Sequence, residues 1–542
     1  MRVSHLQALF AYSCWCVAKV DGFSATPVYH HKISSLPIRS SSQQQQCPFV
    51  NLKQDSPETK HVSSTAVSAS HDGINEVRED ESRILPASIV VGTLTAAMGF
   101  LYGQVLSRTV HTVWKTVPAT LAKRGTVLNP VYFITGTCTL GGLIMGILSA
   151  KLKANFTVAD FVSAFSSVPA EAGKLPQSRS TLMPLLLLSL VTSTFGFSVG
   201  PEAPMVVAGA LVGSSLSRKW FGMGETKKAE NLAYAGAAGA LTAFMGIPIA
   251  GSIFALELTR SSAGLSTGAK EALSPAVAAS VAALVLIRAI LIPNATVGGH
   301  FAYGTVGSIT GRTMMMVAVG SSVIGAALGT VFHKAVALLK GICWPTSSSN
   351  EKGNNAWRRQ VVVKTLIGLA VGLLSSAYPQ TLFWGEGSLQ CVVDGQKTAF
   401  AATKHGLPTL LTTAARVNPS LPFESSKAAL QVGVAKLVAI ALACAGKFPG
   451  GIIFPLFFAA APFAHACSPL VAPSVLPLLV LCTMAATQAS VTRTPLATAL
   501  ILSLSASAST ELSVMLPACL VASYFGVYIS QLLSRNSYFK YS

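Results

Sequence analysis

The sequence predicts an all-α polytopic membrane protein. Half of its 542 residues are hydrophobic and 11% are charged, and the mean hydropathy is +0.55, a balance that soluble proteins rarely tolerate. From Ile84 the chain is apolar almost to its end. Many of the apolar runs are too short to cross a bilayer upright, and glycine and proline interrupt several of them. The sequence therefore predicts a bundle of long tilted helices and short broken helices.

Charge and cysteine content exclude several classes of function. The formal net charge is +19, but no basic stripe with interleaved aromatic residues indicates nucleic-acid binding. The first 83 residues hold as many acidic as basic residues, so the excess positive charge belongs to the membrane body. Loop lysines and arginines that set topology explain part of it, and a positive field that favours anions explains more. The ten cysteines are scattered singly, mostly inside apolar runs, and no spacing indicates a metal site or a disulfide framework.

The N-terminal region has the composition of a targeting sequence. Residues 1–22 have a basic start and a short apolar core, which is typical of a signal peptide, and residues 23–54 are basic, rich in serine and free of acidic residues, as in transit peptides. The junction at Phe23 resembles the bipartite plastid presequences of diatoms and related algae. This resemblance implies a plastid membrane, thylakoid or envelope, of an alga with a complex plastid; an ordinary secretory signal is the alternative. Residues 55–83 are polar and acidic and predict a disordered linker.

The apolar part, residues 84–542, predicts a succession of membrane helices. Five shorter stretches lie near Thr157–Phe165, Met205–Ser217, Ile247–Leu258, Ile452–Ala461 and Leu496–Ser507. Pairs of glycines four residues apart recur, as expected for helices that pack closely in lipid. The clearest spans are Ile84–Ser107, Val131–Ala150, Leu182–Thr194, Ala272–Ile292, Thr313–Leu339, Val361–Ala377, Leu430–Ala445, Val475–Ala486 and Val514–Leu533.

One break in these helices carries a carboxylate. Gly200-Pro201-Glu202-Ala203-Pro204 separates two apolar runs. Irregular backbone at membrane depth is tolerated only where it is buried in protein or lines a watery cavity, and an acidic residue there by default marks an ion or proton pathway. The structural alternative is an interfacial turn in which Glu202 faces water.

The second half of the chain contains a corresponding break. Residues 446–455, GKFPGGIIFP, lead into another short helix, and Pro248 and Pro495 each begin a further short segment in their own half. Interrupted segments at corresponding places indicate an internal repeat, about 84–295 and 311–542, with a binding site at its interface. Because helix N-termini carry free N–H groups and positive partial charge, they hold anions. The pattern predicts an anion pathway that contains a carboxylate.

Four collinear motifs resemble those of the CLC family of voltage-gated chloride channels and chloride/proton antiporters. GPEAP (200–204) is similar to the family's GREGP, and residues 243–258 to the helix that follows it. Residues 446–455 are similar to its GxPGGxFxP motif, and residues 488–502 to its late RAPLTG segment. The resemblance implies a homodimer in a lipid membrane, each subunit an inverted repeat of tilted and broken helices with one pore for chloride or another small anion. It implies no enzyme activity, no cofactor and, since the sequence stops at Ser542, no cytoplasmic CBS pair.

The resemblance also assigns roles to residues. Glu202 is the gating residue, whose charged carboxylate occupies the anion site. Ile452 and Ile453 offer backbone N–H groups to the anion, and Tyr538 offers its hydroxyl, with Tyr541 as a competitor. The motif residues that line the pore are Gly200, Pro201, Ala203, Pro204, Gly450, Gly451, Phe454 and Pro455.

Two departures from the family pattern bear on activity. The family's anion-binding GSGIP motif has no copy, and Asn155 or Thr157 stands near its place, which leaves the preference for chloride or nitrate open. Leu258 stands where antiporters carry a proton-relay glutamate, and the adjacent Glu257 is the one candidate substitute. The sequence therefore favours an anion channel gated by voltage or pH over an antiporter that exchanges chloride or nitrate for protons. An intramembrane hydrolase is a remote alternative, and Glu386 is interpreted as part of a structural turn.

Overall fold

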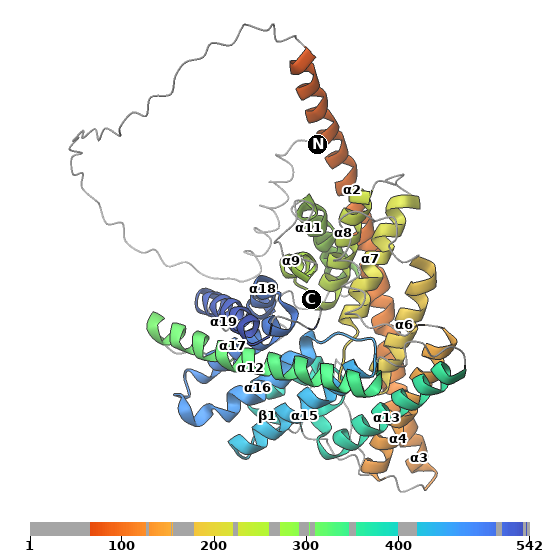
Figure 1. Ribbon diagram of the computed structural model, residues 1–542, viewed down its shortest axis with the longest axis vertical. Helices are drawn as coiled ribbons and strands as arrows, with labels where there is room; N and C mark the ends of the chain where they lie inside the picture. Colours follow the sequence, from red (N-terminus) through yellow and green to blue (C-terminus); the bar gives the residue numbers. More distant parts are fainter. Residues whose placement is uncertain are drawn as a thin grey trace, which may run out of the picture. The chain divides into compact units, whose positions relative to one another are not determined.

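A computed structural model describes residues 65–125, 129–152, 154, 178–219, 226–258, 271–291, 303, 309–345, 354–398, 420–505, 512–534 and 538 (Figure 1). The predicted signal and transit segments lie outside the described residues, as do Asn155, Thr157 and Tyr541. The chain divides into two units, residues 1–67 and 68–542. All described residues from Ser68 onward belong to the second unit.

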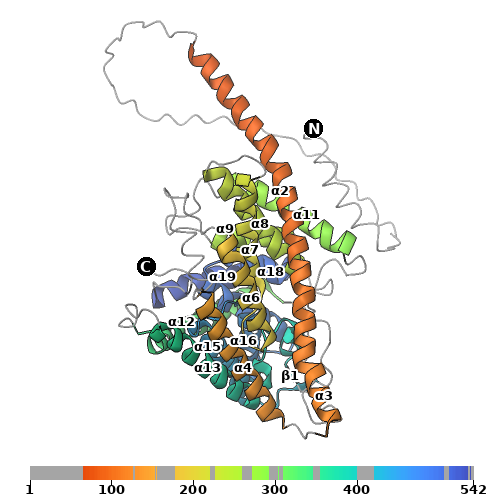
Figure 2. The same ribbon diagram turned by 90° about the vertical axis from the view of Figure 1, so that its right-hand side faces the viewer.

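The first half of this unit contains both long and short helices. α2 (Thr65–His111) continues through a π-turn, η1 (Thr112–Thr116), into α3 (Val117–Lys123), and Figure 2 shows them as one long rod. The remaining helices are α4 (Pro130–Lys151), α6 (Ser178–Thr194), α7 (Glu202–Lys219), α8 (Thr226–Met245), α9 (Pro248–Leu258) and α11 (Leu273–Val285), which ends in the π-turn η3 (Leu286–Leu291).

The second half repeats this alternation. Its helices are α12 (Gly311–Cys343), α13 (Asn354–Ala377), α14 (Leu389–Val393), α15 (Ser426–Ala445), α16 (Ile453–Ala466), α17 (Leu476–Thr492), α18 (Pro495–Ser505) and α19 (Leu512–Leu533). Short 3₁₀ turns lie at Pro379–Thr381, Glu386–Ser388 and Ser468–Leu470. Within the described residues, seven helices are long and apolar enough to cross a membrane, so the protein is an integral membrane protein.

The nine predicted spans and four of the five short stretches are confirmed as helices; the fifth, Thr157–Phe165, lies outside the described residues. Three predictions were wrong in detail. Helix α8 was missed because its first turns hold Lys227, Lys228 and Glu230 and its remainder is rich in weakly apolar alanine and glycine. Helix α2 begins at Thr65, inside the predicted disordered linker, where glutamate and arginine are good helix formers.

The predicted all-α fold class is confirmed, and the third difference is a local one, a small antiparallel ribbon. Strand β1 (Gln396–Thr398) pairs with β2 (Ser420–Pro422), with Lys397 opposite Leu421. Both strands lie between α14 and α15. Three-residue strands are below the length at which alternation of polar and apolar residues is recognisable. The fold is therefore helical apart from this ribbon.

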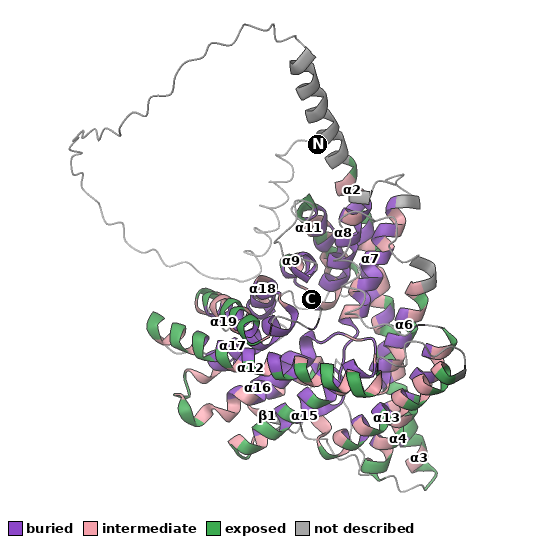
Figure 3. Cartoon of the chain, in the orientation of Figure 1, coloured by how far each residue is buried: buried purple, intermediate pink, exposed green. Residues whose placement is uncertain are grey.

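Glycines allow the helices to pack closely. A Cβ atom at Gly142 of α4 would collide with the carbonyl oxygen of Lys364 on α13, and one at Gly325 of α12 would collide with Ala486 on α17. Gly209 of α7 and Gly236 of α8 exclude a side chain in the same way. Close approach of backbones at small residues is the main source of helix association in lipid, where the hydrophobic effect between helices is lost. Figure 3 shows the resulting pattern, with buried residues concentrated on α7, α8, α9, α16 and α17 and exposed apolar residues on the outer helices, such as α12 and α13.

Candidate functional site

The two broken helices meet at a pair of glycines. The N–H of Gly200 donates to the carbonyl of Gly451 (2.8 Å), and the N–H of Gly451 donates to the carbonyl of Gly200 (2.5 Å), which forms an isolated antiparallel bridge. Gly200 lies two residues before the start of α7, and Gly451 immediately precedes the N-cap of α16. The structure thus brings together the two interrupted segments that the sequence indicated as partners.

Both glycines of the bridge are required by the position of Glu202. A Cβ atom at Gly200 or at Gly451 would collide with the Glu202 carboxylate. At Gly451 it would also come within 3.0 Å of the Ala203 backbone nitrogen. The carboxylate therefore lies directly against the bridge, between the N-termini of two helices.

Glu202 is a buried carboxyl group without a hydrogen bond. It is the first residue of α7 and is 0% exposed, and neither carboxylate oxygen has a hydrogen-bond partner among the described residues. Buried polar atoms in folded proteins are nearly always hydrogen-bonded, so an exception requires an explanation in terms of function. Tyr102, which donates to Ser189 (3.0 Å), and Glu386 interact with Glu202 electrostatically.

The N-terminus of α16 offers backbone donors at the same place. Ile452 is the N-cap residue of α16 with φ −117°, and no side chain caps the helix. The first turn of a helix has N–H groups without intrahelical partners, and these attract anions. Pro455 has no N–H group, so the N-cap residue Ile452 and the next two residues, Ile453 and Phe454, supply the donors; the side chains of all three are buried.

The segment from Tyr378 to Ser388 supports the bridge, and the sequence analysis missed this role. The N–H of Phe383 donates to the carbonyl of Gly196 (3.1 Å), and Ser198 Oγ donates to the carbonyl of Thr381. Lys436 of α15, which is 0% exposed, donates to the carbonyls of Thr381 (3.2 Å) and Phe383 (2.6 Å). A lysine inside the predicted span Leu430–Ala445 was the available signal, because charged residues at membrane depth are rarely without a role.

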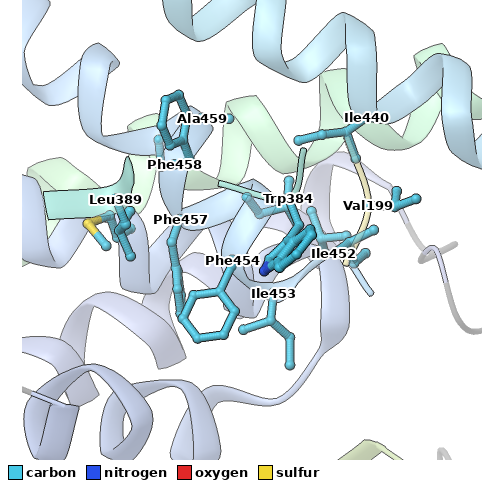
Figure 4. Packing of buried hydrophobic residues seen from close by; sticks show 14 of the residues in the cluster. Val199, Trp384, Leu389, Ile440, Ile452, Ile453, Phe454, Phe457, Phe458 and Ala459 are labelled. Carbon is cyan, nitrogen blue, oxygen red and sulfur yellow. The ribbon is translucent and has the colours of Figure 1, made fainter. Parts of the chain in front are cut away.

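A tryptophan and a glutamate of this segment lie close to the site. Figure 4 shows Trp384 among Ile452, Ile453 and Phe454, and its indole Nε1 donates to Glu386 Oε2 (3.0 Å). Gly385 between them has φ +90°, a backbone conformation that glycine adopts without strain. Glu386 was interpreted only as part of a structural turn, whereas the structure also places it within electrostatic range of Glu202.

A second buried lysine lies behind the second motif. Lys364 of α13 is 0% exposed and donates to the carbonyl of Lys447 (2.8 Å), at the start of the loop that leads to Gly451. Lys364 also lies 5.3 Å from the centre of the Phe448 ring. Both buried lysines thus donate hydrogen bonds to backbone carbonyls of the segments that hold the bridge.

Three further predicted residues, Glu257, Leu258 and Tyr538, are buried. Both Glu257 oxygens accept backbone hydrogen bonds, from Leu496 (3.2 Å) and Ala497 (2.8 Å), at the N-terminus of α18. Tyr538 is 6% exposed, with its ring centre 6.0 Å from that of Phe332. Among the described residues, no group of three or more His, Cys, Asp or Glu side chains could hold a metal ion.

Comparison with known proteins identifies the family. Residues 141–527 match the family model described as "Voltage gated chloride channel". The chain belongs to this family. The match includes all four motifs quoted above.

Individual relatives are distant. Chloride channel protein CLC-e of Arabidopsis thaliana is 23% identical over 316 residues, which is 56% of this chain but 40% of that protein. Three solved structures share the fold. A slow cyanobacterial Cl⁻/H⁺ antiporter has a TM-score of 0.62 at 16% identity and covers 84% of this chain and 96% of its own. A CLC-type fluoride/proton antiporter has a TM-score of 0.59 at 18% identity, and the match covers 83% of this chain and 96% of the antiporter chain. A eukaryotic CLC transporter has a TM-score of 0.60 at 15% identity, and the match covers 84% of this chain and 73% of the transporter chain.

Proposed function

We propose that this protein is a chloride channel whose pore is opened and closed by the carboxylate of Glu202, in response to voltage or pH. The observation that carries the proposal is the buried, unpartnered Glu202 carboxyl group lying against the Gly200–Gly451 bridge. The start of α16, with its backbone N–H groups, directly follows Gly451 of that bridge.

The proposed gate depends on competition for one place. A charged carboxylate and a chloride ion are both stabilised by helix N-termini, so ionised Glu202 occupies the position that an anion would take. Protonation removes the charge and releases the side chain. The anion then meets the N–H groups of Ile452 and Ile453 and the hydroxyl of Tyr538, and Asn155 or Thr157 would complete its ligands.

A channel is favoured over an antiporter by the surroundings of Glu257. Coupled antiport requires a second titratable group that passes protons to the gate from the other side. Leu258 cannot carry a proton, and both Glu257 oxygens hold the backbone of α18. A carboxylate that caps a helix is stabilised in its charged form by those hydrogen bonds, which makes it a poor carrier.

Reversal potentials test this proposal. The purified protein is reconstituted in planar bilayers or liposomes with a chloride gradient and an opposed proton gradient. The current through it should reverse sign at the chloride equilibrium potential. A reversal potential that moves when only the proton gradient is changed would contradict the channel assignment.

The antiporter is retained as a second candidate because Glu386 interacts with Glu202 and is held by Trp384. A carboxyl group there offers a proton route that does not need position 258. In an antiporter, a chloride gradient drives protons across the membrane in the opposite direction. Glu386→Gln should then abolish this proton movement while chloride flux persists. Asp394→Asn is the matched control, since Asp394 is an exposed carboxylate eight residues further along the chain.

Two further assignments belong to the proposal. We infer a homodimer from family membership, and a plastid membrane from the composition of residues 1–54. Fusion of these residues to a fluorescent protein in an alga with a complex plastid should direct it to the plastid; secretion of the fusion would contradict this localisation.

A further inference from the structure

We propose that a groove between α2, η1 and α6 binds the headgroup of an anionic membrane lipid and that this lipid acts on the segment leading to Glu202. The groove encloses about 350 Å³ and is lined by Arg108, Thr109, Thr112, Val113, Thr194 and Phe195, among others. The part of the proposal that concerns flux rests on the proposed function; the part that concerns binding does not.

The depth of Arg108 fits a lipid headgroup. From Ile84 to Ser107 the sequence has no charged residue. In a helix this stretch is about 36 Å long, enough to cross a hydrocarbon core of about 30 Å. Arg108 is the first charged residue beyond it and is exposed, so it lies at the depth of the headgroups, beside an apolar groove that accepts the upper part of an acyl chain.

The charge around the groove selects an anion. The sequence has no acidic residue from Ile84 to Ala159, whereas Arg108, His111 and Lys115 follow one another near the end of α2. Among the described residues, no carboxylate pairs with the Arg108 guanidinium. Basic pockets between membrane helices bind phosphate-bearing headgroups, and the Arg108 guanidinium can make charge-assisted hydrogen bonds to phosphate oxygens.

The floor of the groove is tied to the gate segment. Thr109 Oγ1 and Thr194 Oγ1 share a hydrogen bond (2.8 Å), and the Trp114 indole donates to the carbonyl of Thr194 (2.7 Å). Thr194 is the last residue of α6, and only the five residues 195–199 separate it from Gly200 of the bridge. At Gly196 (φ +84°), a Cβ atom would come within 2.9 Å of the Trp114 ring, so the indole packs directly against this segment. A ligand that orders the groove therefore orders the backbone that positions Glu202.

Binding and flux are measured separately on the same variants. Arg108→Gln removes the charge, and Thr112→Trp fills the groove at an exposed position and leaves Arg108 intact. Arg312→Gln, an exposed arginine at the start of α12, is the matched control for loss of one positive charge. Phosphatidylglycerol binding to the full-length protein is counted by native mass spectrometry, and chloride efflux is compared in phosphatidylcholine vesicles with and without phosphatidylglycerol.

We expect Arg108→Gln to weaken phosphatidylglycerol binding about fivefold, Thr112→Trp to abolish the tightest bound lipid, and Arg312→Gln to bind as the unmodified protein does. Phosphatidylglycerol should change the efflux rate of the unmodified protein and of Arg312→Gln, but not that of the two groove variants. Equal binding by all four proteins would overturn the site. Loss of binding in Arg108→Gln but not in Thr112→Trp would show surface attraction rather than a groove. An absence of chloride flux in every protein, with binding as expected, would contradict the proposed function and leave the lipid site standing.

Discussion

At the scale of single residues, the site is defined by groups that a membrane protein rarely buries. Glu202 is buried without a hydrogen bond, and Lys364 and Lys436 are buried with backbone carbonyls as their hydrogen-bond acceptors. Moving an ionised group out of water costs several kcal/mol unless charge or hydrogen bonds compensate. The helix N-termini supply compensating partial positive charge for Glu202, and the same partial charge stabilises an anion once Glu202 has left.

The contribution of Lys436 to the stability of the folded protein can be measured. Lys436→Met keeps most of the side-chain volume but removes the lysine donor from the carbonyls of Thr381 and Phe383. Leaving a buried acceptor without its hydrogen bond costs about 1–3 kcal/mol, so thermal unfolding in detergent should occur several degrees lower. Lys427→Met, an exposed position on the same helix, should leave the unfolding temperature unchanged. Equal unfolding temperatures for the two variants would contradict the role given to Lys436.

The sequence predicted part of this site. The two glycine-containing motifs and Glu202 were recognised because broken helices and an acidic residue at membrane depth are unusual in themselves. Ser198, Phe383 and Trp384 were not recognised, because their roles come from backbone carbonyls and ring packing contributed by distant segments. Nothing in the residue types alone indicates those partners.

At the scale of helices, length and hydropathy predicted most of the fold. The uninterrupted spans were confirmed because apolar runs of sufficient length have few alternatives in a membrane. Helix α8 was missed because its faces pack on α7 and α11 through small residues, which lowers the hydropathy that prediction relies on. Its glycines and alanines are explained by the close approach of its neighbours.

Contact between α4 and α13 should be sensitive to a single methyl group. Gly142→Ala places a Cβ atom against the backbone of Lys364 and Gly368, so the helices must separate. Overpacking of this kind typically costs about 1–3 kcal/mol, and the unfolding temperature should fall. Gly136→Ala on the same helix has nothing within 4 Å of its new methyl group and should be neutral or slightly stabilising. The prediction fails if both variants unfold together with the unmodified protein.

The stability of helix α18 should depend on Glu257. Two variants at this position distinguish a helix cap from a proton carrier. Glu257→Ala leaves the N–H groups of Leu496 and Ala497 without acceptors, at a cost of about 0.5–2 kcal/mol. Glu257→Gln keeps one acceptor oxygen and should recover part of that stability. If Glu257 serves only as the cap of α18, the reversal potential measured in a proton gradient should be the same for Glu257→Gln and for the unmodified protein. A change in that potential would instead assign Glu257 to proton transfer.

At the scale of the whole molecule, the site exists only because two halves of the chain meet. Gly200 and Gly451 are about 250 residues apart, and each contributes one carbonyl and one N–H to the bridge. In each half a motif helix is followed by a proline-initiated helix, and this repeated order indicated the meeting; α7 and α9, and α16 and α18, follow that order. The Tyr378–Ser388 segment has no counterpart in that pattern, so the repeat could not reveal it.

The most direct test of the account is the pH dependence of chloride efflux from liposomes that contain the protein with Glu202→Ala. An alanine cannot occupy the anion position or change its charge, so efflux should become independent of pH and should equal or exceed the fastest rate of the unmodified protein. Glu271→Ala, which removes an exposed carboxylate ahead of α11, should keep the original pH dependence. If efflux by Glu202→Ala varies with pH as it does in the unmodified protein, Glu202 is not the gate.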